Sequence, residues 1–477
     1  MRSLAEKSYT LARRDHWDAV ARHTDHWHSW GSYYHRRLAE VYSFLIPPGQ
    51  RVLELGCAQG DLLAALRPSF GVGIDLSFEM LKRARKKHPT LHFMQGDVHD
   101  LCLRTKFDVV ILSDLVNDLW DVQKVCHQIL KLVSHRGRII LNTYSRLWEL
   151  PLSMAEKLNL SNRRLPQNWI TVQDLSNMMN LADLQVIRKW QEVLWPLRTP
   201  VLDQLFNRFI VKIWGFKHFA LCNFLIARPD PALYKNTKKP SVSVIVPARN
   251  EAGNIPDVFT RTPEMGNGTE LIFVEGHSKD DTFAVIEKEM AAHPNRPARL
   301  FRQTGEGKGD AVRLGFAHAT GDLLMILDAD LTVPPEDLTR FYDVLSGLKG
   351  DFANGVRLVY PMEKQAMRFF NQIGNKFFSV AFSWLLGQPV KDTLCGTKAL
   401  WNEDYLRISE NRSYFGDFDP FGDFDLLFGG AKLNLKFVEV PIRYRERTYG
   451  TTNIQRWKHG WLLLRMVLFA ANRIKFV

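Results

Sequence analysis

Short apolar runs alternate with longer amphipathic stretches along most of this chain. From Gly49 the runs RVLELG, GVGID, LHFMQ, FDVVILSD and RGRIILNT are separated by stretches of helical periodicity, and the rhythm returns in SVSVIVP, TELIFVEG and DLLMILDAD. This alternation is typical of βαβ units on a parallel sheet. Between the two series, ARPDPALYKNTKKP lacks apolar periodicity. The pattern predicts two α/β domains, at 1–228 and 241–477, joined by a linker at 229–240.

The composition is that of a folded protein, with 45% hydrophobic and 24% charged residues, which excludes disordered and collagen-like chains. A length of 477 residues excludes a single small core. The 63 Lys and Arg exceed the 51 Asp and Glu, giving a net charge of +12. This excess favours an anionic partner such as nucleic acid, a membrane face or a phosphorylated substrate. No nucleic-acid-binding module is recognisable, so we expect no nucleic-acid partner.

The cysteines and the ends of the chain bear on its compartment. The five cysteines are scattered without a CxxC pair, which argues against a disulfide framework and a cysteine zinc site. The first residues, MRSLAEKSYTLARRDHWD, lack the apolar core of a secretory signal. The two most apolar stretches, from Phe209 and from Trp461, are interrupted by Lys or Arg, short of the ~20 residues of a spanning helix. We expect a cytoplasmic protein without a membrane-spanning segment.

A glycine-containing turn follows the first predicted strand. In ELGCAQG, Gly56 and Gly60 allow the backbone to approach a ligand at the start of the next helix. Asp75 ends the second strand, where an acid can bind a ribose diol. Asp97 follows the third strand and suits an adenine amino group. Ala58 occupies the position where dinucleotide sites need glycine against a pyrophosphate, so a nucleoside ligand without pyrophosphate fits better.

These elements resemble those of class I S-adenosylmethionine-dependent methyltransferases over residues 30–228. The resemblance implies a Rossmann-like domain in which Gly56 and Gly60 line the methionine moiety of S-adenosylmethionine, Asp75 the ribose and Asp97 the adenine. Glu54 is a further candidate cofactor-binding residue. The alternatives are a similar turn for another nucleoside and a non-catalytic binding module.

The methyl acceptor is less defined, because methyl transfer needs alignment more than an invariant base. Acceptor-side candidates are Asp114, Asn142, and a cluster in which His26, His28, Trp30 and Tyr34 could cap the site. We favour an amphipathic lid for that cluster and assign no base.

The second half carries polar residues where its strands end. These candidate contacts to a nucleotide sugar are Pro247, Arg249 and Glu251 after the first strand, Glu275, Ser278 and Asp280 after the second, and Lys308 on a glycine-rich turn. A strand ending in LDAD then places Asp328 and Asp330 one residue apart. Two acids at a strand tip need a cation or a basic partner, and hard oxygen ligands suit Mg²⁺ or Mn²⁺.

This ordered set resembles the inverting family 2 glycosyltransferases of GT-A fold from Ser241 to Val477. It is most similar to the branch that loads a sugar onto polyprenyl or dolichyl phosphate, through NGVRL, DTLCGTKAL, FGDFDLLFGGAKLNLKFVEVPIRY and RTYGTTN. The family usually has Gln after the leucine that follows DxD and Ser-Lys after the YG turn. Here Thr332 and Thr452-Asn453 stand instead.

The acceptor class determines which further residues matter. A phosphate monoester, with its second pKa near ~6, attacks the anomeric carbon without a base and needs cations to hold it. Arginines suited to that phosphate are Arg357, Arg368, Arg445 and Arg447. A sugar hydroxyl would instead require a general base, for which Asp425 is the candidate and Asp423 the second.

Two stretches mix aromatic, aliphatic and basic residues. TNIQRWKHGWLLLRMVLFAANRIKFV at the end of the chain, and RFFNQIGNKFFSVAFSWLLGQP from Arg368, are suited to an anionic membrane interface. Helices packed on their own domain, or a dimer contact, are the alternatives.

The combined hypothesis is a bifunctional enzyme, peripheral to the inner membrane face. It would couple methyl transfer with transfer of a hexose from a UDP- or GDP-sugar to a polyprenyl phosphate. The alternatives are a glycan hydroxyl acceptor, in surface polysaccharide synthesis, and a first domain that only binds.

Overall fold

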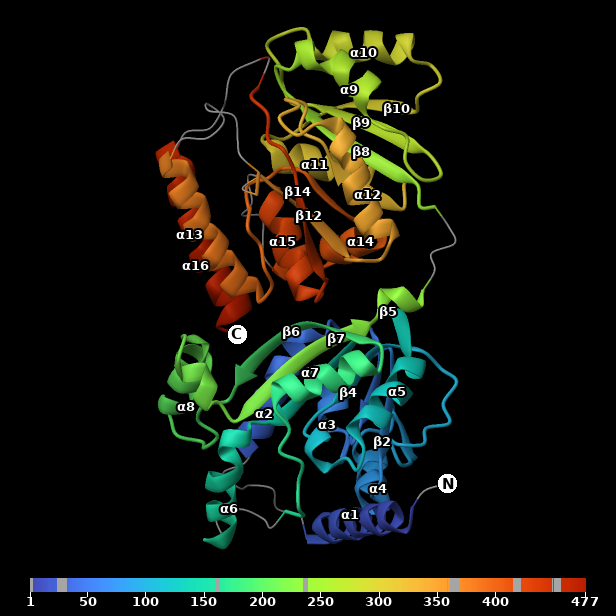
Figure 1. Ribbon diagram of the computed structural model, residues 1–477, viewed down its shortest axis with the longest axis vertical. Coiled ribbons are helices and arrows are strands. Elements are labelled where there is room, and N and C mark those ends of the chain that lie inside the picture. The colour runs from blue at the N-terminus through green and yellow to red at the C-terminus, as the bar shows by residue number, and fades with distance from the viewer. Residues whose placement is uncertain are drawn as a thin grey trace. The chain divides into compact units, whose positions relative to one another are not determined.

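The computed structural model describes residues 3–23, 32–158, 164–234, 239–357, 359–360, 369–414, 422–447, 449 and 456–477. The chain divides into two compact units, residues 1–234 with 476–477 and residues 235–475. Each unit contains a seven-stranded sheet with helices packed on it (Figure 1). The expected fold class of two α/β domains is therefore confirmed.

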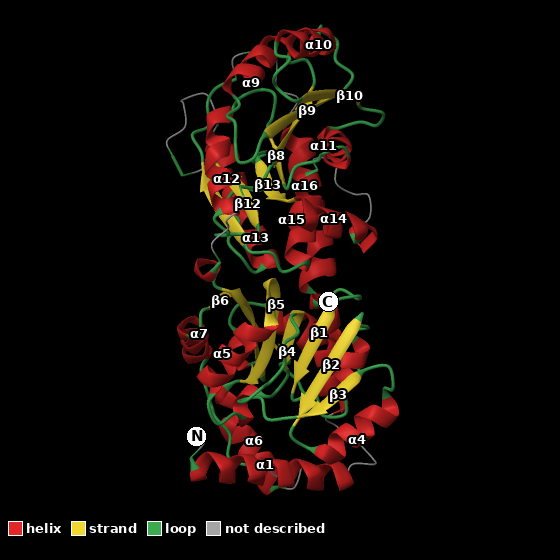
Figure 2. Cartoon of the chain, turned by 90° about the vertical axis from the view of Figure 1, so that its right-hand side faces the viewer, coloured by secondary structure: helices red, strands yellow, loops and turns green. Residues whose placement is uncertain are grey.

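The sheet of the first unit has the strand order β3-β2-β1-β4-β5-β7-β6. Strands β1 to β5 all run parallel to one another, whereas β7 is antiparallel to both β5 and β6. Figure 2 shows β1, β2 and β3 side by side. The strands are β1 (Arg51–Leu55), β2 (Phe70–Asp75), β3 (His92–Gln95), β4 (Phe107–Leu112), β5 (Val133–Tyr144), β6 (Leu184–Glu192) and β7 (Cys222–Pro229).

Helices cover both faces of this sheet because its central strands are apolar on both sides. In β1, Leu53 packs into a core with α5 and α7, whereas Val52 packs into a core with α2 and α4. Ser77 and Asp121 accept hydrogen bonds at the starts of α4 and α5, as N-cap residues do. The helices are α1 (Leu4–His23), α2 (Ser32–Leu45), α3 (Asp61–Ala65), α4 (Phe78–Lys87), α5 (Val122–Leu132), α6 (Glu149–Lys157), α7 (Val172–Leu181) and α8 (Leu202–Gln204).

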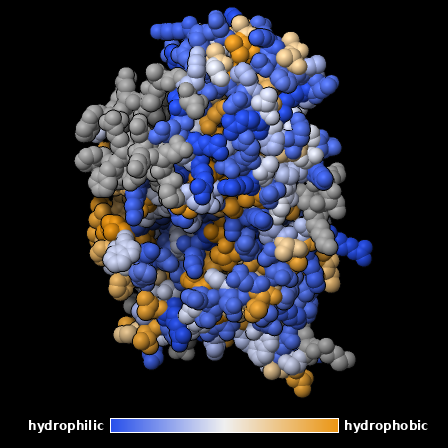
Figure 3. Space-filling model, turned by 45° about the horizontal axis from the view of Figure 1, so that its top comes forward, coloured by the Kyte–Doolittle hydropathy of each residue, from blue (hydrophilic) through white to orange (hydrophobic). Residues whose placement is uncertain are grey.

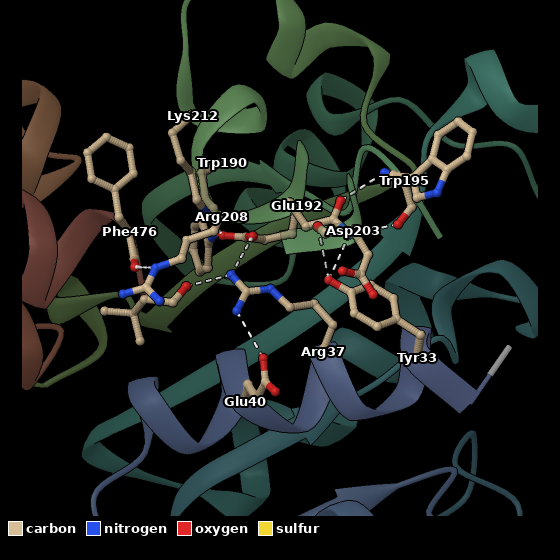
Figure 4. Close-up of polar contacts among 12 residues, drawn as sticks. Tyr33, Arg37, Glu40, Trp190, Glu192, Trp195, Asp203, Arg208, Lys212 and Phe476 are labelled. Carbon is tan, nitrogen blue, oxygen red and sulfur yellow. Dashed lines mark hydrogen bonds and ion pairs between the residues drawn. The ribbon is translucent and has the colours of Figure 1, made fainter. Parts of the chain in front are cut away.

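A buried ionic cluster fastens the end of β6 to its surroundings (Figure 4). Glu192 pairs with the ammonium of Lys212 and, at 3.5 Å, with the guanidinium of Arg37. Although burial alone would raise it, these two cations lower the pKa of Glu192. Arg37 also contacts Glu40 at 3.1 Å. The region around residues 192–212 is therefore held by ion pairs that are shielded from water.

The sheet of the second unit has the strand order β10-β9-β8-β11-β13-β12-β14. Strands β10, β9, β8 and β11 are mutually parallel, β13 is antiparallel to β11 and β12, and β12 is parallel to β14. The strands are β8 (Val242–Ala248), β9 (Thr269–Glu275), β10 (Ala298–Arg302), β11 (Leu323–Ile326), β12 (Phe352–Val356), β13 (Lys398–Trp401) and β14 (Phe437–Pro441).

The central strand β8 is again buried on both sides. Val244 and Val246 lie in a core with α9, α10 and α12. On the opposite face α11 lies close to the sheet, since a Cβ added at Gly315 would come within 2.5 Å of Ile245. The helices are α9 (Ile255–Arg261), α10 (Thr282–Ala292), α11 (Lys308–Ala317), α12 (Leu338–Ser346), α13 (Phe369–Leu386), α14 (Asn402–Glu410), α15 (Asp423–Lys432) and α16 (Arg456–Ala470).

No helix in the described ranges is both long enough and apolar enough to cross a membrane.

Candidate functional site

The strand order of the first unit reverses between β1 and β4, and ligands of α/β sheets bind at the carboxyl ends of such strands. The turn after β1 needs glycine at two positions, because Gly56 and Gly60 have φ of 72° and 75°. A Cβ at Gly56 would come within 2.9 Å of Leu115, and one at Gly60 within 2.6 Å of Phe93. Ala58 also has a positive φ, of 44°. The turn is therefore closely packed on its protein side.

Two carboxylates flank this turn, and neither has a cationic partner among the residues that the structure describes. Burial raises the pKa of Glu54 well above its usual value, and its Oε2 has no hydrogen-bond partner. Asp75 accepts hydrogen bonds of 2.9 Å from the backbone amides of Ala58 and Ser77. Burial nevertheless raises the pKa of Asp75, against the effect of these amides. Both acids are costly to ionise here, so a cationic ligand would stabilise them.

Asp97 follows β3 and is turned toward local partners. Its Oδ1 accepts a hydrogen bond of 3.0 Å from the backbone amide of His99 and lies 2.6 Å from Nδ1 of the same residue. Its Oδ2 lies 3.4 Å from the hydroxyl of Thr10 on α1. The structure thus places Asp97 beside the other predicted residues at the carboxyl edge of the sheet, with α1 against it.

Helix α1 crosses this edge, which the sequence did not indicate. Ser77, after β2, donates a hydrogen bond of 2.5 Å to Asp18 of α1. Tyr9 donates to the carbonyl of Asp118, beyond β4, over 3.4 Å. The cap expected from His26, His28 and Trp30 lies outside the described residues. Helix α1 itself therefore covers the loops after β2, β3 and β4.

The acceptor-side candidates meet in one cluster. Asp114 follows β4 with φ of 54°. Its Oδ1 accepts hydrogen bonds of 2.7 Å from the Tyr34 hydroxyl and 2.5 Å from the Asn142 amide. Burial raises the pKa of Asp114 to about 6, although these two donors oppose the shift. The next residue, Leu115, is the one that packs on Gly56. The cluster therefore lies close to the glycine turn, because the residue next to Asp114 in the sequence packs on that turn.

In the second unit the strand order reverses between β8 and β11. The loops after β8 and β9 are linked by hydrogen bonds, since the Asn250 amide donates to the Ser278 hydroxyl over 3.0 Å. The amide of Ser278 donates in turn to Glu275. Asp280 accepts from the amide of Ala252 over 3.3 Å. The structure gives Glu275, Ser278 and Asp280 a loop-fixing role. Pro247 lies at the end of β8, followed by the exposed Arg249.

The acid pair after β11 is matched by cations. Asp328 pairs with Lys308 at 2.6 Å, and Asp330 pairs with Arg447 at 2.7 Å. Thr332 donates to Asp330 through its amide, at 3.1 Å, and through its hydroxyl, at 2.8 Å. In this chain Thr332 thus orients the second acid of the pair.

A glycine missed in the sequence bears on this pair. A Cβ at Gly396 would lie 2.1 Å from both the Asp328 carboxylate and the Lys308 ammonium. A side chain there would displace this ion pair, so the CGT stretch forms one wall of the acid site. Within the described ranges no group of three or more His, Cys, Asp or Glu is arranged to hold a metal ion. The carboxylate oxygens of Asp328 and Asp330 are hard donors of the kind that Mg²⁺ or Mn²⁺ prefers.

Arg447 bridges two acids. Besides Asp330 it contacts Glu251 at 3.0 Å. Burial raises the pKa of Glu251 to about 7, although Arg447 and Asn254 act in the opposite direction. Close by, a Cβ at Gly253 would meet the Tyr449 ring at 2.6 Å. The segment that ends in Arg447 and Tyr449 therefore closes over the loop after β8.

The remaining predicted residues are engaged elsewhere or not described. Arg357 forms two hydrogen bonds, of 2.7 and 2.8 Å, with the buried Asp392. Asp425, at the start of α15, pairs with Arg412 at 2.8 Å. Arg357 is thus committed to a buried ion pair, and Asp425 to a salt bridge. The backbone amide of the exposed Arg445 donates a hydrogen bond of 2.9 Å to the Thr332 carbonyl. Neither Arg368 nor Thr452-Asn453 is among the described residues, and the Asp423 side chain is not described.

Comparison with known proteins finds one family model in each unit. A model of glycosyl transferase family 2 matches residues 243–406, and a methyltransferase-domain model matches residues 46–194. The glycosyltransferase AglJ of Haloferax volcanii is 30% identical over 226 residues, covering 47% of this chain and 69% of that protein. The dolichol-phosphate mannosyltransferase of Pyrococcus furiosus is 28% identical over 222 residues, covering 45% of this chain and 59% of that protein. The chain thus spans less than two thirds of the latter.

For the first unit, an S-adenosylmethionine-dependent methyltransferase from Mesorhizobium loti is a similar solved structure. It is 19% identical, with a TM-score of 0.32, over 40% of this chain and 97% of that one. The chain belongs to glycosyl transferase family 2, which its second unit represents, and it carries a methyltransferase domain as its first unit. The two family resemblances seen in the sequence are confirmed.

Proposed function

We propose that the chain is a bifunctional enzyme. Its first unit transfers a methyl group from S-adenosylmethionine, and its second transfers a hexose from a nucleotide sugar to a polyprenyl phosphate. One observation supports the proposed sugar transfer above all. Asp328 and Asp330 form ion pairs with Lys308 and Arg447 where the strand order of the sheet reverses. The relatives named for sugar transfer to dolichol phosphate support the acceptor class.

The residues of the second unit divide the reaction between them. Asp328 and Asp330 would hold Mg²⁺ or Mn²⁺, which supplies charge stabilisation to the departing nucleoside diphosphate. Lys308, released from Asp328, meets the diphosphate. Arg447, released from Asp330, presents its planar guanidinium to the acceptor phosphate. A phosphate oxygen then bonds to the anomeric carbon as the bond to the diphosphate breaks, with inversion and no general base.

A hydroxyl acceptor remains the alternative, with Asp425 as base. The salt bridge between Asp425 and Arg412 argues against it, because that carboxylate would have to leave its partner to accept a proton.

In the first unit the uncompensated acids fit a cationic donor. Glu54 has an oxygen without a partner, and Asp75 retains lone pairs beyond its two amide contacts. S-adenosylmethionine, when bound, supplies a methyl group on a positively charged sulfur. Asp114, held by Tyr34 and Asn142, would orient the acceptor and receive its proton.

The second unit also offers a contact to the membrane that carries a polyprenyl phosphate. Helix α16 exposes 64% of Trp461 and 59% of Leu468, and α13 exposes 65% of Val380. With Arg465 between the first two, these side chains suit an anionic interface. We therefore propose a peripheral enzyme at the cytoplasmic face.

The test is product formation. Purified protein with Mg²⁺ or Mn²⁺ is incubated with UDP- and GDP-sugars and a short-chain polyprenyl phosphate, and lipid products are identified by mass spectrometry. A glycosylated lipid phosphate is expected. A product formed only with a glycan acceptor would contradict the proposal and make Asp425→Asn the next variant.

A further inference from the structure

Helix α6 turns an apolar stripe toward solvent. Leu147, Leu150, Met154 and Leu158 follow the spacing of one helix face and are 62, 76, 62 and 66% exposed. On the other side, Leu152 packs on the domain core. A surface helix normally buries its apolar stripe against its own domain, and α6 buries none of these four.

A second apolar segment adjoins this helix. Between residues 201 and 219 the chain exposes Trp214 by 85%, Phe216 by 52% and Phe219 by 63%. The indole of Trp148, directly before α6, donates a hydrogen bond of 2.8 Å to the Phe219 carbonyl. Figure 1 shows α6 and α8 in the same part of the first unit. Residues 147–158 and 201–219 thus form one surface, which we call the apolar face.

The backbone behind the apolar face is firmly held. Lys212 is buried and pairs with Glu192 (Figure 4). The Asn207 amide donates to the Tyr33 hydroxyl at 3.0 Å and to the Trp195 carbonyl at 2.6 Å. These contacts fix the inner side of the segment, so its aromatic side chains are presented on a preformed surface.

The fully exposed Lys, Arg, Asp and Glu side chains of the apolar face are basic. They are Lys157 and Arg208, and Arg146, directly before the face, is exposed as well; Glu149 and Glu156 are partly buried and Asp203 is buried. No Asp or Glu of these segments is exposed. Figure 3 shows groups of hydrophobic side chains among hydrophilic ones on one face of the molecule. Aromatic and aliphatic groups rimmed by basic ones are the pattern of a bilayer contact.

We propose that the apolar face of the first unit docks on an anionic lipid bilayer. Trp214, Phe216 and Phe219 would enter the headgroup region with the α6 stripe, and the basic rim would meet lipid phosphates. A second copy of the chain is disfavoured as occupant, because pairing two apolar faces would bring two basic rims together. The methyl acceptor would then be met at the membrane surface. Only this consequence rests on the proposed methyl transfer, since docking is measured without catalysis.

The test places a fluorescent reporter in the apolar face of the full-length protein. Cys102 is the exposed cysteine and the other four are buried, so Cys102→Ser provides the background. A single cysteine at Leu150 carries an environment-sensitive dye. The matched control carries it at Leu181, which is 57% exposed at the end of α7 and outside the apolar face. Vesicles contain phosphatidylcholine alone or with an equal amount of phosphatidylglycerol.

We expect the dye at position 150, and not at 181, to brighten and shift to the blue with phosphatidylglycerol vesicles. Adding Trp214→Ser should weaken that binding by about tenfold, equivalent to about 1.4 kcal/mol, because an aromatic side chain no longer enters the bilayer. No change at 150, or equal changes at both positions, would overturn the proposal even if the protein sedimented with vesicles through its second unit. A change that needs concentrated protein and no vesicles would overturn it in favour of a second copy.

Discussion

The carboxylates at the two switch points differ in how their charge is compensated. In the first unit Glu54, Asp75 and Asp114 have no ion-pair partner within the described residues, and burial raises the pKa of each. In the second unit Asp328 and Asp330 are each joined to a cation of the chain, Lys308 or Arg447. Both sites lie where the strand order of a sheet reverses. Among the described residues, the acids of the first site have no cationic partner, whereas those of the second are paired with cations of the chain.

This difference indicates what each site accepts. A cationic ligand stabilises buried acids that lack partners, as a sulfonium donor would in the first unit. In the second, under the proposed function, a metal ion bound by the acids would release Lys308 and Arg447 to bind diphosphate and phosphate groups. The comparison can be tested by removing one charge at a time.

Asp330→Asn should have the largest effect. It removes a proposed metal ligand and the ion-pair partner of Arg447, so we expect sugar transfer to fall by roughly 10²–10³-fold. Nucleoside diphosphate release measures the rate. Asp343→Asn, an exposed acid on α12, is the control. Wild-type turnover in Asp330→Asn, with the fold intact by circular dichroism, would remove the acid pair from the mechanism.

Asp75→Ala tests the uncompensated site. We expect affinity for S-adenosylmethionine to fall by about 10–100-fold, because a hydrogen bond to a charged group contributes ~1.5–3 kcal/mol. Isothermal titration calorimetry measures this, with Asp343→Asn as the distant control. An unchanged dissociation constant would show that the ribose does not lie at Asp75.

Arg447→Ala separates the two substrates of the second unit. We expect the KM for the lipid phosphate to rise about tenfold and that for the nucleotide sugar to change less. Arg447→Lys keeps the charge but not the planar fork, so it should recover part of the loss. Equal increases for both substrates would place Arg447 on the donor instead.

Asp114→Asn should have the smallest effect of these variants. We expect it to change the stability of the folded protein by an amount that depends on pH. The folded-state pKa of Asp114 is raised to about 6, so the unfolded chain binds fewer protons between about pH 4 and 6 and wild-type stability falls as pH rises through that window. The asparagine of the variant does not ionise, so the stability of the variant does not fall for this reason as the pH rises. Its melting temperature relative to wild type should therefore be higher by a few degrees at about pH 7.5 than at about pH 4. A difference independent of pH would contradict the shift.

Methyl transfer by the wild type should conversely decline below about pH 6, where Asp114 is protonated.

Strand tips were the most predictable part of both sites. The glycines and acids after β1, β2 and β11 could be placed from sequence because a parallel sheet brings its carboxyl ends to one edge. Pairings between distant segments could not. Arg447 and Asp330 are 117 positions apart, and nothing local indicates that Arg357 faces Asp392. The position of α1 over the loops after β2, β3 and β4 could not be predicted either. It depends on contacts with distant residues, which the periodicity of the helix sequence does not indicate.

The most direct test of the charge comparison is proton release on ligand binding. S-adenosylmethionine is titrated into the full-length protein near pH 6, in buffers of different ionisation enthalpy. Acids whose pKa is raised in the free protein should lose their protons when a cationic ligand binds beside them. The account therefore predicts that binding releases protons, and that Asp75→Ala releases fewer. Binding without proton release, or no binding, would contradict it.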